Sequence, residues 1–388
     1  MINFKTYTYR LYPNNIQKNK IDTTIIAARL IYNKVLAARI IVFYTYRSYI
    51  KKCNEQGVQP NICEINKHNQ MPSLPSIKKQ YPFTKTVDSL ALCAELNNVN
   101  KAFKNYNEHR CKFPTFKKTK DRNSYATSNV NNNIRIEHKR IRLPKIGFVK
   151  VRLHRELPTN AVIKRCVVFE DKCGKYYVAI VVSYEENIVK SINKDENLNN
   201  VVGLDFKMGD IYVSSDGETP KYDAPYRTML KTLHCLESKL KRREKFSNNW
   251  YKFIGRIRRI HKFIAFKRKD FIHKLTTKLS KRYDMVAIES LNLKSIAKKV
   301  KGKIELYDTS YCIFVKRLTY KLQILGKNIC KIDRWFPSSK KCSKCGNIKK
   351  KLKLNQRTYN CKKCGLSLDR DINASINIRN EGIRALKN

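Results

Sequence analysis

Two pairs of cysteines near the C-terminus have the spacing of a zinc-binding site. The pattern consists of two C-x2-C motifs, at Cys342, Cys345, Cys361 and Cys364. Fifteen residues, 346–360, separate the pairs, a distance within the range of a zinc ribbon. Gly346 and Gly365 follow the pairs and allow the tight backbone turns that form beneath a metal. We therefore expect structural Zn2+ here, in a ribbon that by itself could also be a DNA-binding finger.

Three carboxylates stand at the ends of elements that are otherwise apolar. Asp205 lies in the predicted strand VVGLDF, Glu289 ends the strand MVAIE, and Asp371 begins the last helix. A buried carboxylate is costly unless it is paired or binds a cation. Oxygen ligands favour Mg2+ or Mn2+ over zinc. Two such ions can activate water and stabilise the leaving oxygen in phosphodiester hydrolysis.

Each carboxylate also has an ordinary structural explanation. Asp205 could face solvent at a strand edge, and Glu289 could cap the loop that follows it. Asp371 could be a helix N-terminal acid favoured by the helix dipole, and Asp369 competes with it as the third acid of the site. Taken together, however, the three carboxylates occupy the positions expected in a sheet of the RNase H type.

The charge of the chain indicates a polyanionic partner. Its 388 residues include 82 Lys and Arg against 31 Asp and Glu, a net charge of +51 that extends over nearly the whole length. Such a charge opposes folding by self-repulsion, and nucleic acid is the partner that best compensates it. A lysine-rich composition from an AT-rich genome is the alternative, but Asp and Glu have not risen with Lys.

The composition also indicates where the protein acts. The 42% hydrophobic content is that of a globular chain. Nine of the 13 cysteines are scattered, the start of the chain lacks a signal peptide, and no run approaches the roughly 20 apolar residues of a membrane span. We expect a cytoplasmic, nucleoid-associated protein of prokaryotic type, with reduced thiols and no membrane partner.

The N-terminal half predicts a β-rich unit interrupted by helices. Residues 3–12 alternate as a strand, 15–50 and 85–106 have helical periodicity, and four further strands follow in 134–184. Residues 53–82, the basic and aromatic segment 111–129, and 185–200 are expected to be irregular. The strands predict a small barrel or sheet that the first strand could join, which would make the helical region an insertion.

The C-terminal half has the order of an α/β domain. Strands are expected at 201–206, at 283–289 and in NICKIDR, with DIYVSSDG as a hairpin partner of the first. One long, densely basic helical region is expected at 225–282, and helices at 308–325 and 372–386. The part of the basic region at 239–274 could lie along nucleic acid or be a solvated face.

At this point the motifs resemble those of the TnpB family, insertion-sequence proteins of the OrfB type that are similar to compact type V CRISPR effectors. The resemblance covers nearly the whole chain. It rests on KTYTYRLYPNNIQ, ARLIYN, FPTFKK, SYAT, GLDFK, IESLNL, SSKKCSKCG and LDRDINASINI. The last three are specific in their order and spacing.

The resemblance implies an RNA-guided DNA endonuclease. Its fold would be α/β plus β-barrel: an RNase H-like RuvC domain at 201–335 and 367–388 with a zinc ribbon inserted at 336–366, and a barrel at 1–14 and 107–190 with a helical insertion at 15–106. The catalytic, Mg2+-binding residues would be Asp205, Glu289 and Asp371. A guide RNA from the transposon end would direct cleavage of double- or single-stranded DNA beside a short motif.

Basic, aromatic and amide side chains in these motifs are the candidate nucleic-acid contacts: Arg10, Tyr12, Lys117, Lys118, Arg370 and Asn373. Tyr7 and Tyr9 could stack on bases or belong to the core. Asn373 could orient the neighbouring acid, bind phosphate or cap the helix, and Arg370 could contact phosphate or form a salt bridge.

One departure from the family concerns Lys207, which stands at a position that is often Gly or Ser in the family. Its side chain could pair with a catalytic acid or contact a phosphate.

A guide-dependent DNA-binding regulator and an accessory transposase are the alternative functions. A monomer or a homodimer is expected.

Overall fold

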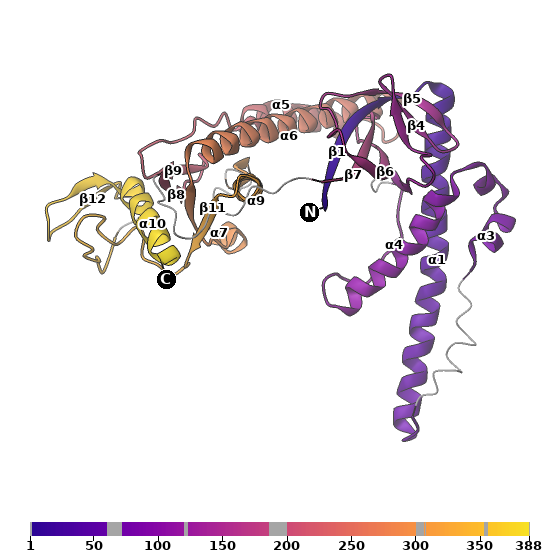
Figure 1. The fold of residues 1–388 in the computed structure, drawn as a ribbon, viewed down its shortest axis with the longest axis horizontal. Helices are drawn as coiled ribbons and strands as arrows, with labels where there is room; N and C mark the ends of the chain where they lie inside the picture. The colour runs from indigo at the N-terminus through magenta and orange to yellow at the C-terminus, as the bar shows by residue number, and fades with distance from the viewer. Residues whose placement is uncertain are drawn as a thin grey trace. The chain divides into compact units, whose positions relative to one another are not determined.

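The computed structural model divides into two compact units, Met1–Asn187 and Ile188–Asn388 (Figure 1). The residues described are 2–59, 72–119, 123–185, 200–299, 306, 308–352 and 356–387. The expected irregular segment at 185–200 therefore lies almost entirely outside the described residues, as does part of the one at 53–82. None of the described helices is long and apolar enough to cross a membrane.

The N-terminal unit is built on a seven-stranded sheet with the order β2-β6-β7-β1-β5-β4-β3. Its strands are β1 (Ile2–Tyr12), β2 (Ser124–Ser128), β3 (Arg135–Glu137), β4 (Arg140–Leu143), β5 (Gly147–Arg152), β6 (Val162–Glu170) and β7 (Tyr176–Glu185). The first strand joins the sheet at its centre, antiparallel to β5 and β7, as the sequence predicted. Pairing between β2 and β3, which would close a barrel, is not recorded among the described residues.

The alternation of β1 decides which of its aromatic residues are available for binding. Tyr7, Tyr9 and Leu11 point into the core and are at most 5% exposed, whereas Tyr12 on the opposite face is 40% exposed. Side chains on alternate residues of a strand share one face, so the core face and the outer face are set by sequence. Tyr7 and Tyr9 are therefore core residues.

Helices lie between β1 and β2 in the chain: α1 (Asn15–Glu55), α3 (Leu74–Gln80), the 3-10 helix η1 (Pro82–Thr86) and α4 (Ser89–Asn107). Asn14 and Gln17 form a capping box that starts α1 directly after Pro13.

The expectation of irregular structure was wrong at two places. Part of 53–82 forms α3, and SYATS in 111–129 forms β2, whose Thr127 hydroxyl donates to the buried Asp88 at the start of α4.

The C-terminal unit contains a four-stranded sheet with the order β11-β10-β8-β9. Its strands are β8 (Val201–Phe206), β9 (Tyr212–Ser214), β10 (Met285–Glu289) and β11 (Asn328–Ile332). The strands β8, β10 and β11 run parallel, and β9 is the antiparallel hairpin partner that the sequence predicted for β8. The near-continuous apolar residues of β8 and β10 agree with burial on both faces.

Different helices cover the two faces of this sheet. Val202 and Leu204 share a core with α6 (Asn248–Arg282) and α9 (Tyr311–Ile324), whereas Met285 and Ala287 pack with α10 (Arg370–Lys387) on the other face. By the period-two rule, Asp205 and Glu289 fall on the α10 face. The short helix α7 (Leu293–Lys299) follows β10, where the sequence suggested only a loop.

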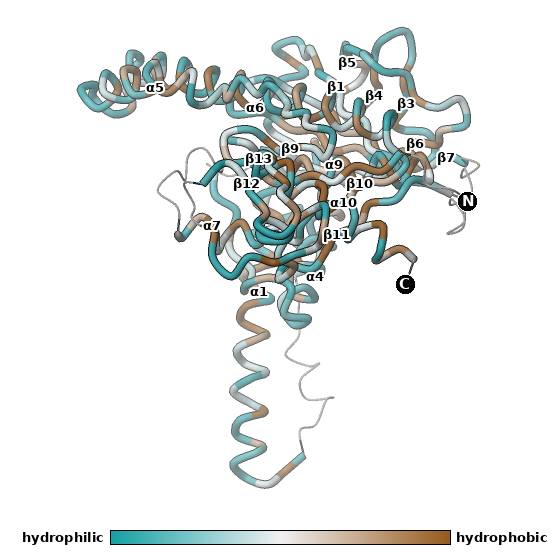
Figure 2. Tube along the Cα trace, turned by 90° about the vertical axis from the view of Figure 1, so that its left-hand side faces the viewer, coloured by the Kyte–Doolittle hydropathy of each residue, from teal (hydrophilic) through white to brown (hydrophobic). Residues whose placement is uncertain are grey.

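The basic helical region is two helices rather than one. The helix α5 (Pro225–Lys241) ends before α6 begins, and the Ser247 hydroxyl caps α6 by accepting from the Trp250 backbone N–H. The expected basic segment at 239–274 thus spans a break at 242–247. The two helices pack against each other, and hydrophilic turns predominate along α5 (Figure 2).

Candidate functional site

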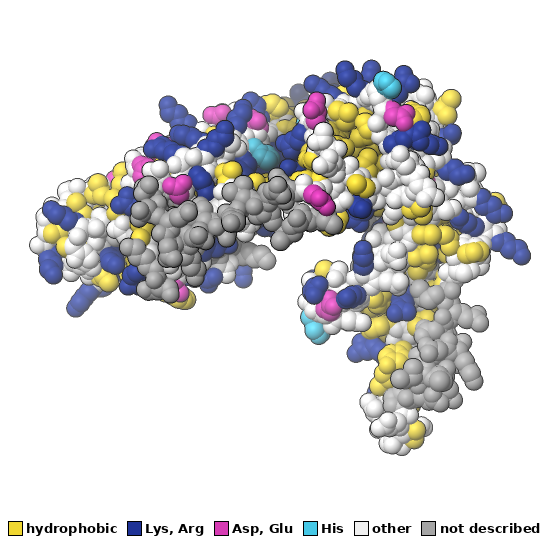
Figure 3. Space-filling view, viewed as in Figure 1, with side chains coloured by type: hydrophobic (Ala, Val, Ile, Leu, Met, Phe, Trp, Pro, Cys, Tyr) yellow, Lys and Arg dark blue, Asp and Glu magenta, His cyan; other side chains and the backbone are white. Residues whose placement is uncertain are grey.

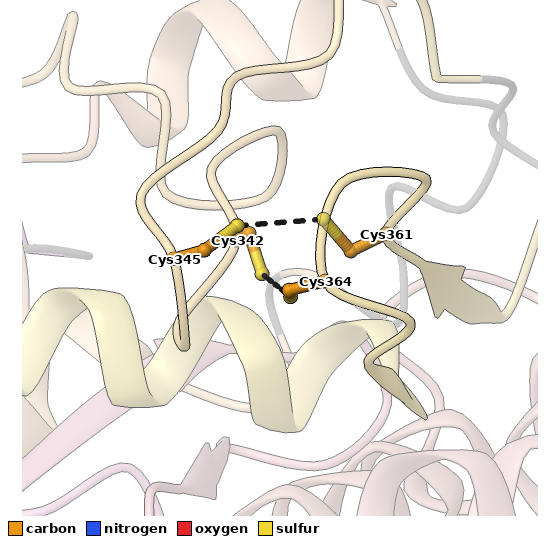
Figure 4. A group of neighbouring side chains, drawn as sticks. All are labelled: Cys342, Cys345, Cys361 and Cys364. Atoms are coloured by element: carbon orange, nitrogen blue, oxygen red, sulfur yellow. Dashed lines mark hydrogen bonds between the residues drawn. The ribbon is translucent and has the colours of Figure 1, made fainter.

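The four predicted zinc ligands come together in the structure. The sulfur atoms of Cys342, Cys345, Cys361 and Cys364 all lie within 4.8 Å of one another, and the pairs face each other from two loops (Figure 4). The Cys342–Cys364 and Cys345–Cys361 sulfur distances are both 3.6 Å. Tetrahedral zinc with bonds of about 2.3 Å would place its sulfurs about 3.7 Å apart. The donor set therefore fits structural zinc.

The two cysteine loops have the same backbone construction. In each, the glycine after the second cysteine has a positive φ, +75° at Gly346 and +71° at Gly365. Each of these glycine N–H groups donates to the carbonyl of the first cysteine in its pair. The backbone N–H groups of Cys364 and Lys363 lower the pKa of the Cys361 thiol to about 6. Burial and the neighbouring thiols raise the pKa of Cys364 in the same loop, so the backbone favours the thiolate, the form that binds zinc, at Cys361 alone of this pair.

The ribbon has a small core of its own. The strands β12 (Thr358–Asn360) and β13 (Ser367–Asp369) pair antiparallel beneath the cysteines. Tyr359 is fully buried, and its hydroxyl donates to the Lys340 carbonyl at 3.0 Å. Because β13 continues directly into α10, the fold of the ribbon determines where that helix begins.

Asp205 and Glu289 lie side by side at the ends of parallel strands. Leu204 of β8 is in register with Ile288 of β10, so the next residues of the two strands are neighbours. Asp371 lies in the first turn of α10, the helix that covers this face. We refer to these three residues as the carboxylate site.

The electrostatics of the carboxylate site are those of crowded, poorly solvated negative charges. Burial raises the pKa of Asp205 well above its usual range, and the charges of Glu289 and Asp371 raise it further, while Arg370 opposes the shift. Burial also raises the pKa of Glu289, against a hydrogen bond from Ser338. Negative charges that repel one another in a low-dielectric site favour a bound cation.

A buried tyrosine that the sequence did not single out completes this environment. Tyr311 is 4% exposed, its ring lies 4.7 Å from that of Phe206, and its hydroxyl has no hydrogen-bond partner among the described residues. Burial raises its pKa, and Glu289 and Asp205 raise it further. The three carboxylates do not converge as tightly as the cysteines. An oxygen-only donor set beside an unpartnered hydroxyl fits a hydrated Mg2+ or Mn2+ site.

The structure separates the roles of the two aspartates that competed in the sequence. The Asp369 carboxylate accepts from the backbone N–H groups of Asp371 and Ile372, at 2.8 and 3.1 Å, and so caps α10. It is exposed. Asp371 is the aspartate whose charge acts on Asp205. The capping function therefore belongs to Asp369, which leaves Asp371 for the carboxylate site.

Lys207 does not pair with the carboxylate site. Its ammonium lies 3.3 Å from the Asp210 carboxylate, in an ion pair within the β8–β9 turn. The lysine that replaces the usual small residue of the family is thus neutralised by a neighbouring aspartate of the same turn.

Asn373 has hydrogen-bond partners in the ribbon that the sequence did not reveal. It is fully buried, its amide nitrogen donates to the Lys341 carbonyl at 2.8 Å, and its amide oxygen accepts from the Ser343 N–H at 3.0 Å. Both ends of the amide are bound to ribbon backbone, and the expected phosphate contact or orientation of Asp371 stays a prediction. Asn373 anchors the first cysteine loop to α10.

Among the candidates in the N-terminal unit, the partly buried Arg10 lies against the exposed Tyr12. The Arg10 guanidinium lies 4.7 Å from the centre of the Tyr12 ring on the outer face of β1. The Arg10 Nε has no hydrogen-bond partner among the described residues. A cation stacked on an exposed ring suits contacts with bases and phosphates.

Lys117 has a structural partner that the sequence did not reveal. Its ammonium lies 2.5 Å from the carboxylate of Glu95, which is 2% exposed, and 4.2 Å from the Tyr32 ring centre. Its backbone N–H and carbonyl both bond to the Asn33 side chain. Lys117 therefore neutralises a buried charge inside the unit, and its expected contact with nucleic acid stays a prediction. Lys118 beside it is exposed.

Two further features could bind nucleic acid. A cavity of about 550 Å³ between α1 and α4 is lined by Phe43, Tyr46, Phe103 and Tyr106 together with Arg39 and Arg47. Lys and Arg side chains also gather along α5 and α6 (Figure 3). The cavity escaped sequence reasoning because its rings come from helices about 60 residues apart in the chain.

Comparison with protein families identifies three segments. Residues 1–47 match an OrfB helix-turn-helix domain, 179–300 match the OrfB family described as "Probable transposase", and 311–378 match a Cas12f1-like TNB domain. In this chain the first segment consists of β1 and the start of one continuous helix, α1.

Two curated relatives extend over nearly the whole chain. A "Putative RNA-guided DNA endonuclease" of Streptomyces pristinaespiralis is 29% identical over 387 residues, covering 98% of this chain and 90% of that protein. A "Putative RNA-guided DNA endonuclease InsQ" of Escherichia coli K12 is 26% identical over 398 aligned positions, covering 97% and 92%.

A solved structure shares the fold. The cryo-EM structure of a Cas12f1-sgRNA-target DNA complex superposes with a TM-score of 0.57 at 13% identity, covering 97% of this chain and 99% of that one. Together with the OrfB segments and the full-length relatives, this likeness confirms the resemblance seen in the sequence motifs. The chain therefore carries two OrfB segments and resembles the TnpB family over nearly its whole length.

Proposed function

We propose that this chain is an RNA-guided DNA endonuclease that hydrolyses phosphodiester bonds at Asp205, Glu289 and Asp371. The observation that carries the proposal is the placement of Asp205 and Glu289 at neighbouring positions on parallel strands, with Asp371 in the first turn of the helix that covers this face. Burial and the other two acids raise the pKa of Asp205 despite the opposing charge of Arg370. A metal-dependent nuclease has a use for that arrangement, and a purely structural domain would be destabilised by it. The names of the two full-length relatives support the same activity.

The cations would be Mg2+ or Mn2+, held by the three carboxylates. Such ions, when bound, supply an activated water and stabilise the charge on the leaving oxygen. The chain itself would orient the ligands. The end of β10 places Glu289, and the Asp369 cap fixes the start of α10 and hence Asp371. Arg370, whose charge reaches Asp205, would contact the scissile phosphate.

The remaining parts would hold nucleic acid. An RNA–DNA heteroduplex is recognised by its backbone and shape, so a broadly basic surface suits it. The proposed contacts are the Arg10–Tyr12 pair, Lys118, the cavity between α1 and α4, and the basic faces of α5 and α6. We assign the seven-stranded sheet to a barrel-type domain with α1–α4 as its insertion. A guide RNA from the transposon end and a short motif beside the DNA target complete the proposal.

Zinc in the ribbon would be structural. Four cysteine ligands leave no open position for water or substrate. The ribbon lies between Glu289 and Asp371 in sequence, and it would brace the start of α10 as well as guide the substrate strand.

An accessory transposase is the second candidate, and the match of residues 179–300 to the "Probable transposase" family favours it. In that case DNA cleavage or joining would proceed without a guide RNA. A guide-dependent regulator that does not cut DNA is a further alternative.

One experiment separates these functions. The chain is expressed with its native downstream DNA and purified, and the RNA that copurifies is sequenced. Cleavage of matching DNA is then assayed with Mg2+, using Asp205→Ala as the inactive variant and Asp223→Ala, an exposed carboxylate of the same unit, as the control. We expect bound RNA and cleavage that only Asp205→Ala abolishes.

The other results would each point elsewhere. Absence of RNA would refute both guided functions, and bound RNA without cleavage would leave the regulator. Cleavage that survives Asp205→Ala would refute the assigned site.

A further inference from the structure

Glu289 receives a hydrogen bond from a residue of the loop that leads into the zinc ribbon. The Ser338 hydroxyl donates to the Glu289 Oε1 at 2.5 Å. Ser338 is 5% exposed and lies 49 positions further along the chain. A glutamate has three rotatable side-chain bonds, so a buried donor on one oxygen selects one rotamer and leaves the other oxygen for a ligand.

Ser338 is itself held by the helix that carries Asp371. The Asn377 side-chain amide donates both hydrogens, one to the Ser338 carbonyl at 2.8 Å and one to the Lys341 carbonyl at 2.7 Å. Asn377 is 3% exposed. Its amide replaces backbone partners that the loop lacks, because the loop runs over α10 rather than along a strand.

The same loop continues directly into the zinc ligands. Asn373, one turn before Asn377 on α10, binds the Lys341 carbonyl and the Ser343 N–H on either side of Cys342. Residues 338–343, which we call the relay loop, therefore connect Glu289 to the first cysteine pair. The side chains of Ser338, Asn373 and Asn377 are nearly or fully buried, and that of Glu289 is partly buried. Buried polar networks with all partners satisfied are rigid.

We propose that Ser338 is a positioning residue for Glu289 and that Asn377, through the relay loop, couples the zinc ribbon to the divalent-cation site. This inference rests on the proposed function only in assuming that Glu289 binds a cation. One helix then sets two of the three acids, Asp371 through its first turn and Glu289 through the relay loop. The ribbon thereby helps to fix the positions of the acids relative to one another.

The test measures cation binding as well as cleavage. In full-length protein, the rise in melting temperature on adding Mn2+ is titrated, and Asp205→Ala defines the signal that does not come from the carboxylate site. Ser338→Ala removes the hydroxyl, and Ser338→Thr retains it. Ser339→Ala is the matched control, because it removes a hydroxyl at the next position, for which no contact to Glu289 is recorded.

We expect Ser338→Ala to raise the half-saturating Mn2+ concentration about 10-fold or more, in both the melting and cleavage titrations, since partners that orient metal ligands typically contribute about 10- to 100-fold. Ser338→Thr should restore most of the affinity, and Ser339→Ala should match the wild type. Zinc content should be unchanged in all three variants.

Asn377→Ala tests the coupling. It should weaken Mn2+ binding in the same direction, and the double variant with Ser338→Ala should lose less than the sum of the single effects, as residues of one network do. Additive effects would refute the coupling.

The proposal fails if Ser338→Ala, correctly folded and zinc-loaded, binds Mn2+ like the wild type. If the extra methyl of Ser338→Thr disturbs the buried loop, the comparison of Ser338→Ala with Ser339→Ala still tests whether the Ser338 hydroxyl supports Mn2+ binding. A wild-type protein that binds Mn2+ through Asp205 and Ser338 but does not cut guided DNA would refute the proposed function and leave this inference standing.

Discussion

The backbone of Gly203 lies so close to that of Ser375 that a β-carbon at residue 203 would come within 2.1 Å of the Ser375 carbonyl oxygen. It would also lie 2.5 Å from the Arg379 backbone nitrogen. A second glycine, Gly382, makes a similar approach to Ala287 of β10. These contacts let α10 lie directly on β8 and β10, and this close packing brings Asp371 near Asp205.

Gly203→Ala should therefore damage both folding and cleavage. The added methyl has no space against fixed backbone, and overpacking of this kind costs about 1–3 kcal/mol or more. The free energy of unfolding, measured by denaturant titration, should fall by at least that amount. Gly255→Ala is the control: a β-carbon there meets no described atom within 4 Å, and alanine in a helix should add about 0.5–1 kcal/mol. Equal stability of the two variants would contradict the packing argument.

Asp205→Asn should stabilise the protein at neutral pH while abolishing cleavage. Burial and the charges of Glu289 and Asp371 raise the pKa of Asp205 in the folded chain. The folded state therefore binds the proton more tightly than the unfolded one, and the stability this contributes is present below about pH 4 and is lost as the pH rises through the folded pKa. Asparagine does not ionise and avoids that loss.

Melting temperatures without added divalent cations test this prediction. The variant should melt above the wild type near pH 7, and the difference should shrink toward pH 4. Adding Mg2+ should narrow the difference at neutral pH by stabilising only the wild type. A variant that melts below the wild type at pH 7 would show that Asp205 is paired rather than under-solvated.

Lys117→Ala should affect stability more than nucleic-acid affinity. The substitution leaves the carboxylate of Glu95, which is 2% exposed, without its ammonium partner, at an expected cost of about 1–3 kcal/mol. The double variant with Glu95→Gln should recover part of that loss, because the uncompensated charge is gone. A large loss of RNA affinity with unchanged melting temperature would restore Lys117 as a nucleic-acid contact.

Arg10→Ala and Tyr12→Ala should affect nucleic-acid affinity more than stability. Both side chains lie on the outer face of β1, so melting temperatures should change little. Base stacking contributes about 1–3 kcal/mol per base, so nucleic-acid affinity should fall about 5- to 150-fold for Tyr12→Ala. Arg10→Ala should also reduce the salt dependence of binding, measured by filter binding at several ionic strengths. Unchanged affinity in both variants would remove this pair from the interface.

Cys361→Ala should impair cleavage more than guide binding. Loss of one zinc ligand loosens the ribbon and the start of α10, whereas the proposed RNA contacts of β1, α5 and α6 lie elsewhere in the chain. Zinc content, RNA retention and cleavage rate are measured on the same preparation. RNA retention that falls as steeply as cleavage would instead make the ribbon part of the guide-binding surface.

Several features could be predicted from sequence because they depend on short-range patterns. The C-x2-C pairs with their glycines predicted a ribbon, and the four sulfurs do meet. The alternation of β1 predicted a strand that could join the N-terminal sheet, and it lies at the centre of that sheet. Three carboxylates at the ends of apolar elements were recognisable for the same reason, since their immediate neighbours determine strand and helix.

Partners across long separations required the tertiary structure. Local pattern could not separate Asp369 from Asp371, because both lie at the start of the same helix, and only the backbone geometry shows Asp369 capping it. Lys117 has the composition of a phosphate contact, yet it neutralises Glu95. Ser338 carries no local sign that it binds Glu289. Periodicity and spacing are local properties of the chain, so the sequence alone identified the candidate residues of this site. Hydrogen-bond and ion-pair partners depend on how distant elements pack, so only the tertiary structure shows which residues those candidates contact.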